Sequence, residues 1–288
     1  EMYKYPENIP KKNLDLISKL KIFQIYKNLK YPSIKIDSYF QVYEEIFKNY
    51  IGKKIIFVEV GVLGGGSLFM WKDYFGKDAR IIGIDLNPEA KKWEKHGFEI
   101  FIGSQSDETF WKNFRETVGM VDVVLDDGGH TYEQQIVTTE MLLGNIKDCG
   151  LLVVEDTHTS YMDGFGLKKY SFIEYAKRFI DKINYRFGNL ESKNADHRVW
   201  SIQAYESVIA FKINRGASNL TSEPTDNGGS DDAALDYRYD DIQLVKTFMR
   251  LSSIANFVKH IPVARRLAAL VLNYIVIRKR SSLKKFFR

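Results

Sequence analysis

Short apolar runs alternate with helix-length polar segments through the middle of the chain, and this rhythm constrains the fold more than any other feature. Each run is almost continuously apolar, which is typical of parallel strands that are buried on both faces. The five runs are residues 55–60, 81–84, 99–102, 121–125 and 151–154. The segments between them, which have the length and patterning of helices, are 67–75, 88–96, 107–118 and 132–146. The sequence therefore predicts an α/β fold with a doubly wound, mostly parallel sheet.

The flanking segments predict how the chain is divided. Residues 12–30 and 38–50 are expected to form two helices ahead of the sheet. A helix at 171–183 and an antiparallel hairpin of 199–204 with 208–213 are expected to complete the sheet at its edge. The predicted divisions are an N-terminal helical segment (1–50), a core domain (51–214), a linker or mobile loop (215–240) and C-terminal helices with a basic tail (241–288).

Positive charge is concentrated at the C-terminal end. Eight of the 42 basic residues lie after residue 259, where no acidic residue occurs, so the preceding residues hold 34 basic and 37 acidic side chains. Nucleic-acid binding needs a basic surface, and we therefore expect no nucleic-acid partner for the body of the protein. The mixed apolar and basic pattern of 261–288 is typical of a helix that packs on the body or on another subunit. It is also typical of a helix in peripheral contact with an anionic membrane.

The sequence predicts a cytoplasmic protein. Its single cysteine, Cys149, forms no intramolecular disulfide, and the first residues contain no apolar run of the kind found in secretory leaders. The longest apolar stretch near the end, 267–277, covers 11 positions, whereas a membrane-spanning helix needs ~20. If the tail lies on lipid, the protein would be peripheral at the inner face of the membrane.

A glycine-rich turn, Glu59-Val-Gly-Val-Leu-Gly-Gly-Gly-Ser67, ends the first apolar run. Glycines let a backbone approach a ligand closely, and the helix expected to begin near Ser67 would offer free N–H groups. Leu63 stands where a dinucleotide-binding G-x-G-x-x-G loop has its second glycine. Glu59, Gly61 and Gly65 instead fit the E-x-G-x-x-x-G loop of methyltransferases that use S-adenosylmethionine. A tight strand-to-helix turn without a ligand is the alternative.

Polar residues also follow the second and third runs. Asp85 directly follows the second run, where an acidic side chain can accept hydrogen bonds from ribose hydroxyls. This contact does not separate S-adenosylmethionine from NAD, because both contain a ribose. Ser104 and Gln105 follow the third run and would meet an adenine edge, whereas Ser106 is equally explained as a helix N-cap.

Four carboxylates and two histidines follow the fourth and fifth runs: Asp126, Asp127, His130, Glu155, Asp156 and His158. So many acids on one rim repel each other unless a cation is present, and an oxygen-rich set suits Mg²⁺ better than zinc. One or two of these acids would instead cap the helices that follow. We assign that structural role to Asp126, because Asp127 lies three residues before His130 and both can face one cleft.

These stretches together resemble the metal-dependent O-methyltransferases that include the macrocin and mycinamicin sugar methyltransferases, a group related to the so-called cephalosporin hydroxylases. The resemblance runs from about residue 38 to residue 161, nearly half of the chain. The segments that carry it are 57–61, 65–71, 82–85, 126–130 and 154–161. The resemblance implies a Rossmann-like class I methyltransferase fold, and it implies a homo-oligomer.

The resemblance also implies roles for individual residues. Asp127, Glu155 and Asp156 would hold Mg²⁺, and His130 would be the general base. Glu59, Gly61 and Asp85 would lie in the S-adenosylmethionine site, although Ser104 stands where we expect an acidic residue. The complete predicted cofactor site comprises Glu59, Gly61, Gly65, Ser67, Asp85, Ser104, Gln105 and Asp126.

The predicted reaction is the Mg²⁺-dependent transfer of a methyl group from S-adenosylmethionine to a hydroxyl of a sugar-containing small molecule or glycan. A sugar hydroxyl is a poor nucleophile, so a Lewis-acid metal and a neutral histidine that takes its proton are complementary aids. His158 and Tyr161 are candidate substrate contacts, though a histidine in the position of His158 more often has a structural role.

Two other functions are compatible with an α/β protein that has a glycine-rich turn. An NAD-dependent nucleotide-sugar oxidoreductase or epimerase would need a glycine at position 63 and a Tyr-x-x-x-Lys motif after the fourth run. Residues 26–30 match that motif but lie before the glycine-rich turn. A non-catalytic, membrane-associated interaction protein that has kept the fold is disfavoured, because all four residues of the expected site are present: Asp127, His130, Glu155 and Asp156.

Overall fold

The structure is a computed structural model that describes residues 11–187 and 194–229, the single positions 238, 246 and 274, and residues 284–286. The chain divides into two compact units, Glu1–Pro224 and Thr225–Arg288. In the second unit the one element with described bounds is η7 (Lys284–Phe286). The helices expected within 241–288 and the basic tail therefore lie almost entirely outside the described residues.

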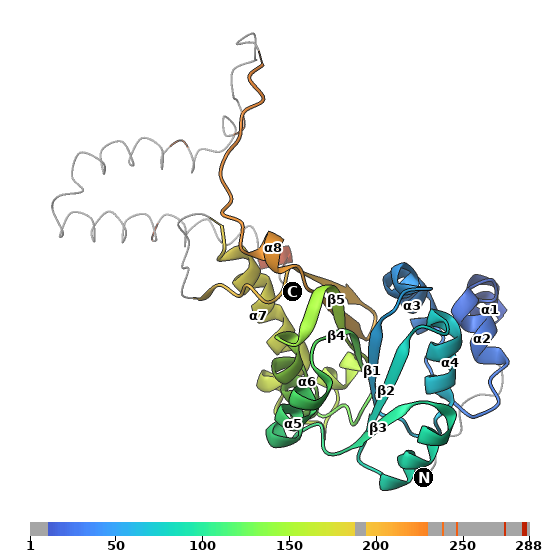
Figure 1. Cartoon of the computed structure of the whole chain (residues 1–288). Helices are drawn as coiled ribbons and strands as arrows, with labels where there is room; N and C mark the ends of the chain where they lie inside the picture. Colours follow the sequence, from blue (N-terminus) through green and yellow to red (C-terminus); the bar gives the residue numbers. More distant parts are fainter. Residues whose placement is uncertain are drawn as a thin grey trace. The chain divides into compact units, whose positions relative to one another are not determined.

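One seven-stranded sheet forms the centre of the first unit (Figure 1). Its strands are β1 (Ile56–Val60), β2 (Arg80–Asp85), β3 (Glu99–Ile102), β4 (Val121–Asp126), β5 (Ile146–Val154), β6 (Ser201–Tyr205) and β7 (Val208–Lys212). Their order is β3-β2-β1-β4-β5-β7-β6. The first five strands are parallel, whereas β7 is antiparallel to both β5 and β6. The predicted doubly wound, mostly parallel sheet with an edge hairpin is confirmed.

Helices cover both faces of this sheet (Figure 1). On one side lie α1 (Lys11–Ile17), α2 (Lys21–Lys27), α3 (Tyr39–Phe47) and α4 (Gly66–Phe75). On the other side lie α5 (Glu108–Val118), α6 (Tyr132–Leu143) and α7 (Phe172–Asn184). Each face has its own core of buried side chains, because strands with apolar residues on both sides must be covered on both sides. The remaining helices of the first unit are η1 (Lys48–Tyr50), η2 (Pro88–His96), η3 (Thr157–Tyr161), η4 (Lys168–Tyr170) and α8 (Arg215–Ser218).

Three helix predictions differ from the structure. The single helix expected at 12–30 is two helices, because Leu20 adopts an extended conformation between α1 and α2. The segment at 88–96 is a 3-10 helix, which starts with Pro88 and is capped by the Asn87 side chain. The helix expected to run to residue 146 ends at Leu143, since Ile146 already pairs with Val121 in the sheet. Among the described residues, no helix is long and apolar enough to cross a bilayer.

The strand order reverses between β1 and β4, which are parallel neighbours in the sheet. From β1 the chain crosses over to β2 and β3 on one side, and it then returns to β4 and β5 on the other. The loops after β1 and β4 therefore leave the same edge in opposite directions and open a crevice between them. Ligands of doubly wound proteins bind in that crevice, so the topology alone places the site at the carboxyl ends of β1 and β4.

The core between α3, α4 and the sheet is rich in aromatic rings. Phe57 on β1 is fully buried among Phe47, Trp71 and Phe75, with ring centroids 6.0, 5.0 and 5.0 Å away. Such pairs add stabilisation beyond the burial of apolar area. This cluster fixes α3 and α4 against β1, the strand whose end begins the site.

Replacing Phe57 by Ala should lower the free energy of unfolding by about 3–5 kcal/mol, because the neighbouring rings cannot fill the cavity left behind. Denaturant unfolding followed by circular dichroism measures the change. The matched control is Ile180→Ala on α7, which removes a side chain that is 56% exposed and should change stability by less than about 0.5 kcal/mol. A Phe57→Ala protein as stable as the control would contradict this view of the core.

Candidate active site

A cavity of about 890 Å³ opens at the carboxyl ends of the strands. Its walls are the loops after β1, β2, β3, β4 and β5, together with the segment between α2 and α3. The lining segments are 32–36, 60–64, 84–87, 103–105, 127–130, 155–156 and 158–159. All the loops that the sequence marked as polar strand ends therefore contribute to one cavity, whose volume is typical of a small-molecule site.

The glycine-rich turn lies tightly against neighbouring loops. Gly61 has φ +92°, and a Cβ atom at this position would be 2.1 Å from the Asp127 carbonyl oxygen. Gly65 has φ +79°, and its Cβ would be 2.2 Å from the Trp93 ring. A side chain at either position would clash, so the two glycines let the turn after β1 touch the loop after β4 and η2. Gly61 and Ser67 line the cavity, whereas Gly65 shapes the turn from behind.

Asp85 ties the end of β2 to this turn. Its Oδ2 accepts hydrogen bonds from the backbone N–H groups of Val62 (2.8 Å) and Leu63 (3.0 Å), and its Oδ1 accepts from Asn87 N–H (2.8 Å). Asp85 lines the cavity. Four lone-pair directions are available on a carboxylate, so one stays free on Oδ1 for a ligand hydroxyl.

Glu59 lies behind the turn, outside the cavity lining. It is fully buried and accepts hydrogen bonds from the Ser67 hydroxyl (2.8 Å) and the Trp71 indole N–H (2.9 Å). Burial raises the pKa of Glu59 to about 7, while the nearby Lys35 ammonium and these two donors act in the opposite direction. Its contacts fix the start of α4 and so support the cofactor loop from below.

The loop after β3 reaches the loop after β4 through Gln105. The Gln105 amide donates to both Asp126 oxygens (3.0 and 3.2 Å), and its carbonyl oxygen accepts from Gly129 N–H (2.7 Å). Ser104 and Gln105 line the cavity, but Asp126 lies beneath it. Asp126 is 1% exposed, and burial raises its pKa to about 7.

Both predicted helix caps in these loops are wrong. Asp126 does not cap the helix that follows it. Thr131 caps α6, and it forms a reciprocal capping box with Gln134. In the same way, α5 is capped by Asp107 rather than by Ser106. In both cases the residue next to the first helical turn provides the cap, because only a side chain at that place reaches the free N–H groups.

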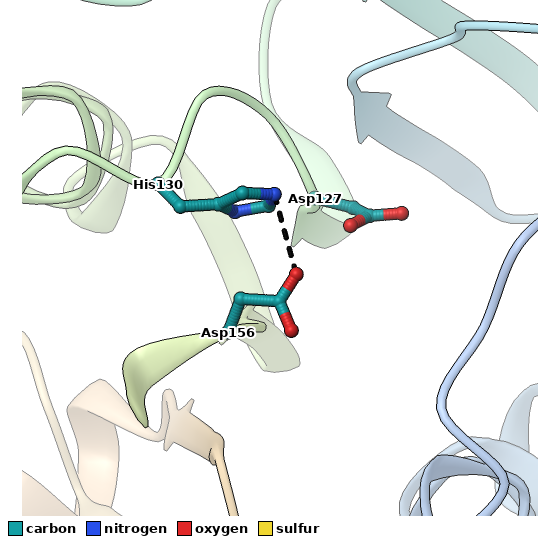
Figure 2. Close-up of side chains that lie close together, drawn as sticks. All are labelled: Asp127, His130 and Asp156. Atoms are coloured by element: carbon teal, nitrogen blue, oxygen red, sulfur yellow. Dashed lines mark ion pairs between the residues drawn. The ribbon is translucent and has the colours of Figure 1, made fainter. Parts of the chain in front are cut away.

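Asp127, His130 and Asp156 converge on the cavity from the ends of β4 and β5. They offer ligand atoms that all lie within 4.8 Å of one another. The His130 ring points toward Asp156, with Nε2 3.2 Å from Oδ2 (Figure 2). His130 Nδ1 is buried and has no hydrogen-bond partner among the described residues. Two carboxylates and an imidazole at this separation fit a divalent metal ion.

The backbone at this cluster is strained. His130 has φ +62° and Asp156 has φ +53°, in the left-handed region that residues with a side chain rarely adopt. Such conformations cost about 1–3 kcal/mol and are concentrated at functional sites. The strain aims both side chains at the same point of the cavity.

Three residues of the N-terminal segment contact the acidic rim, which is the group of carboxylates of Glu59, Asp127, Glu155 and Asp156. The sequence did not mark these three as site residues. Tyr39 donates a hydrogen bond to Asp156 Oδ1 (2.6 Å), and Tyr43 donates to Glu155 Oε1. The Lys35 ammonium lies 2.6 Å from Asp127 Oδ2, 3.2 Å from Glu155 Oε2 and 3.9 Å from Glu59 Oε1. Both Glu155 oxygens are therefore engaged by the chain itself.

The charges of this rim depend on one another. Burial alone would lower the pKa of Lys35, but Asp127, Glu155 and Glu59 together raise it above its ordinary value. Burial also raises the pKa of Glu155, against the opposing effect of Lys35. The side chain of Lys35 is 2% exposed, so its ammonium lies among carboxylates with almost no water. The cation that so many acids require is thus supplied, in this structure, from within the chain.

The two predicted substrate contacts lie at different places. His158 lines the main cavity, and its Nδ1 is hydrogen-bonded to the Ser207 hydroxyl. Tyr161 is 69% exposed and lines a neighbouring cavity of about 500 Å³, which His158 and Tyr39 also line. His158 thus stands between the two cavities.

Curated relatives of this chain are sugar O-methyltransferases. It is 31% identical over 137 residues to an 8-demethyl-8-alpha-L-rhamnosyl tetracenomycin-C 2'-O-methyltransferase of Streptomyces olivaceus, covering 45% of this chain and 36% of that protein. It is 31% identical over 131 residues to a mycinamicin VI 2''-O-methyltransferase of Micromonospora griseorubida, covering 43% and 32%. The chain thus spans about a third of the length of the curated relatives it matches. No protein-family model matches the chain.

Solved structures show the same fold. The methyltransferase MycE of the mycinamycin biosynthetic pathway, in complex with Mg and S-adenosylhomocysteine (SAH), superposes with a TM-score of 0.60. The match covers 72% of this chain and 56% of MycE at 23% sequence identity. This chain therefore has the Rossmann-like class I methyltransferase fold, as its sequence resemblance implied.

Glu59 gives a prediction about pH. Its folded-state pKa of about 7 lies above the ordinary 4.5, so the folded protein holds this proton more tightly than the unfolded chain does. The stabilisation from the group is complete below about pH 4.5 and is lost as the pH rises through about 7. The stability of the unmodified protein relative to Glu59→Gln should therefore fall by at most about 3 kcal/mol between pH 5 and pH 8.

Denaturant unfolding at a series of pH values measures this difference. Glu116→Gln, which changes an exposed acid on α5, is the matched control and should give a difference that does not vary with pH. The same flat profile for Glu59→Gln would contradict the assigned pKa.

Proposed function

We propose that this chain is a Mg²⁺-dependent O-methyltransferase that transfers the methyl group of S-adenosylmethionine to a hydroxyl of a sugar or glycosylated small molecule. The observation that carries the proposal is that the glycine-rich turn with Asp85 and the Asp127–His130–Asp156 cluster open into one cavity. In-line methyl transfer needs the donor and the metal-bound acceptor to lie side by side, which requires one shared cavity. The similarity to sugar O-methyltransferases over nearly half of the chain supports the same reaction class.

The donor half of the cavity is formed by the loops after β1, β2 and β3. Gly61 and Ser67 would face S-adenosylmethionine, and the free lone pair of Asp85 would accept from a ribose hydroxyl. Ser104 and Gln105 line the wall where the adenine would lie. Glu59, Gly65 and Asp126 would act indirectly, because they hold these loops in place from below the lining.

The acceptor half is formed by the loops after β4 and β5. Asp127 and Asp156, with Glu155 as a third carboxylate, would hold Mg²⁺. When bound, the ion would supply Lewis-acid chemistry at the acceptor hydroxyl. His130 would take the hydroxyl proton, and its orientation is fixed by Asp156 at 3.2 Å. His158, which lines the main cavity, and Tyr161, which lines the neighbouring one, would contact the sugar.

The donor assignment predicts a binding phenotype for Asp85. Asp85→Ala removes the acceptor for the ribose hydroxyl and also loosens the turn at Val62 and Leu63, so S-adenosylmethionine should bind at least about tenfold more weakly. Isothermal titration calorimetry measures the affinity. Asp78→Ala, at an exposed acid outside the cavity, is the control and should bind normally. Binding of NAD in place of S-adenosylmethionine would refute the proposed function and favour an oxidoreductase.

The acceptor assignment predicts different effects for loss of the metal and loss of the base. EDTA should stop turnover and Mg²⁺ should restore it, and Asp127→Ala should have the effect of EDTA. His130→Ala should still bind Mg²⁺ but transfer the methyl group about 10²–10⁴-fold more slowly, with partial recovery at high pH where hydroxide replaces the missing base. Transfer of a radiolabelled methyl group to glycosylated acceptors measures the rates.

His96→Ala, at an exposed histidine outside the cavity lining, is the control for the His130 variant and should retain full activity. Full turnover in EDTA would contradict the metal assignment. Loss of Mg²⁺ binding in His130→Ala would show that His130 is a metal ligand rather than the base.

A further inference from the structure

The Lys35 ammonium occupies the acidic rim as a cation would. It comes from the segment between α2 and α3, and it lies within 4 Å of three carboxylates, those of Asp127, Glu155 and Glu59. Its side chain is 2% exposed, and its nearest partner is Asp127 Oδ2 at 2.6 Å. A lysine so completely surrounded by acids is not a surface ion pair, because almost no water remains to screen the charges.

Two of these carboxylates, those of Asp127 and Glu155, are metal ligands in the proposed function. Lys35 uses Asp127 Oδ2 and Glu155 Oε2, and the second Glu155 oxygen accepts from the Tyr43 hydroxyl. Glu155 is not a member of the Asp127–His130–Asp156 cluster, although it lines the same cavity. An ion bound to Glu155 Oε2 would lie against the Lys35 ammonium, which is already 3.2 Å from that oxygen.

We propose that Lys35 is an internal competitor of the divalent cation: its ammonium neutralises Asp127 and Glu155 until the ion binds, and it is displaced when the ion takes those carboxylates. This inference rests on the proposed function, since it takes the metal site as its starting point. Lys35 is a positioning residue in this account, because it acts through the two carboxylates and touches no reacting group.

Electrostatics favours displacement over coexistence. An ion bound to Asp127 would place two positive charges close to an ammonium that is 2.6 Å from the same carboxylate, in a region with little screening by water. Lysine has four rotatable methylenes, and the cavity that residues 32–36 line gives the ammonium space to move into. The oxygens that Lys35 leaves are the hard ligands that Mg²⁺ prefers.

Competition has a reciprocal consequence. If Lys35 lowers the affinity for the metal, the metal must lower the affinity of Lys35 for its carboxylates by the same factor. The wall formed by residues 32–36 is therefore coupled to metal loading, although this segment holds no metal ligand. Couplings of this kind typically change affinity by about 5- to 150-fold.

The first test measures Mn²⁺ affinity by calorimetry, without substrate or turnover. Lys35→Met should bind Mn²⁺ about 10- to 100-fold more tightly than the unmodified protein, because the competing charge is gone. Lys35→Arg keeps the charge and should stay within about threefold of the unmodified protein. Lys30→Met is the matched control, since it removes an exposed lysine from the same segment. Equal or weaker Mn²⁺ binding by Lys35→Met would overturn the inference.

The second test uses the unmodified protein, because Lys35→Met leaves buried carboxylates without a counter-charge and can impair folding. Acetylation by an amine-reactive ester, read by peptide mass spectrometry, should be slow at Lys35 in EDTA and at least about tenfold faster with saturating Mg²⁺. Lys30 should react equally fast in both conditions. Unchanged protection of Lys35 with Mg²⁺ bound would overturn the inference.

The two proposals fail in distinguishable ways. If Mn²⁺ binds and Asp127→Asn abolishes its binding, the metal site stands, and equal affinities with and without Lys35 overturn only the competition. If neither the unmodified protein nor Lys35→Met binds Mn²⁺, the metal site of the proposed function fails, and the competition fails with it.

Discussion

The charge balance at the carboxyl ends of β1, β4 and β5 is the constraint on which the site depends. Glu59, Asp127 and Glu155 are brought together by the sheet, and the Lys35 ammonium is held among them at 2.6–3.9 Å. Leaving such acids without a counter-charge would cost several kcal/mol. The N-terminal segment is therefore part of the site: it brings Lys35 to the carboxylates, and Tyr39 and Tyr43 on α3 donate to Asp156 and Glu155.

The fold divides the cavity into two halves with different chemistry. Loops after β1, β2 and β3 are held by backbone hydrogen bonds to Asp85 and by glycines that allow close approach, which suits a nucleoside-like donor. Loops after β4 and β5 present carboxylates and His130 from strained backbone positions, which suits a cation and proton transfer. The reversal of strand order between β1 and β4 places the two halves next to each other.

Local patterns predicted the sheet and the loops of the site, whereas contacts between distant segments could not be predicted. Apolar runs mark buried strands, and parallel strands end at one edge, so the meeting of Asp127, His130 and Asp156 follows from the sequence. The side-chain direction of Glu59 does not, because it depends on Ser67 and Trp71 one helix away. Lys35 lies in a segment without periodicity, 92 residues from Asp127. In the sequence, the only sign of a cation was the excess of acidic residues at the strand ends. That excess does not show whether the cation is a metal ion or a lysine ammonium.

The most direct test of this account is a crystal structure of the protein grown with Mn²⁺ and SAH, with anomalous scattering used to locate the metal. The account predicts an anomalous peak bonded to Asp127 and Asp156, SAH beside the turn after β1, and the Lys35 ammonium out of hydrogen-bond distance of Asp127 and Glu155. SAH in place with no metal peak, and with Lys35 still between the two carboxylates, would contradict it.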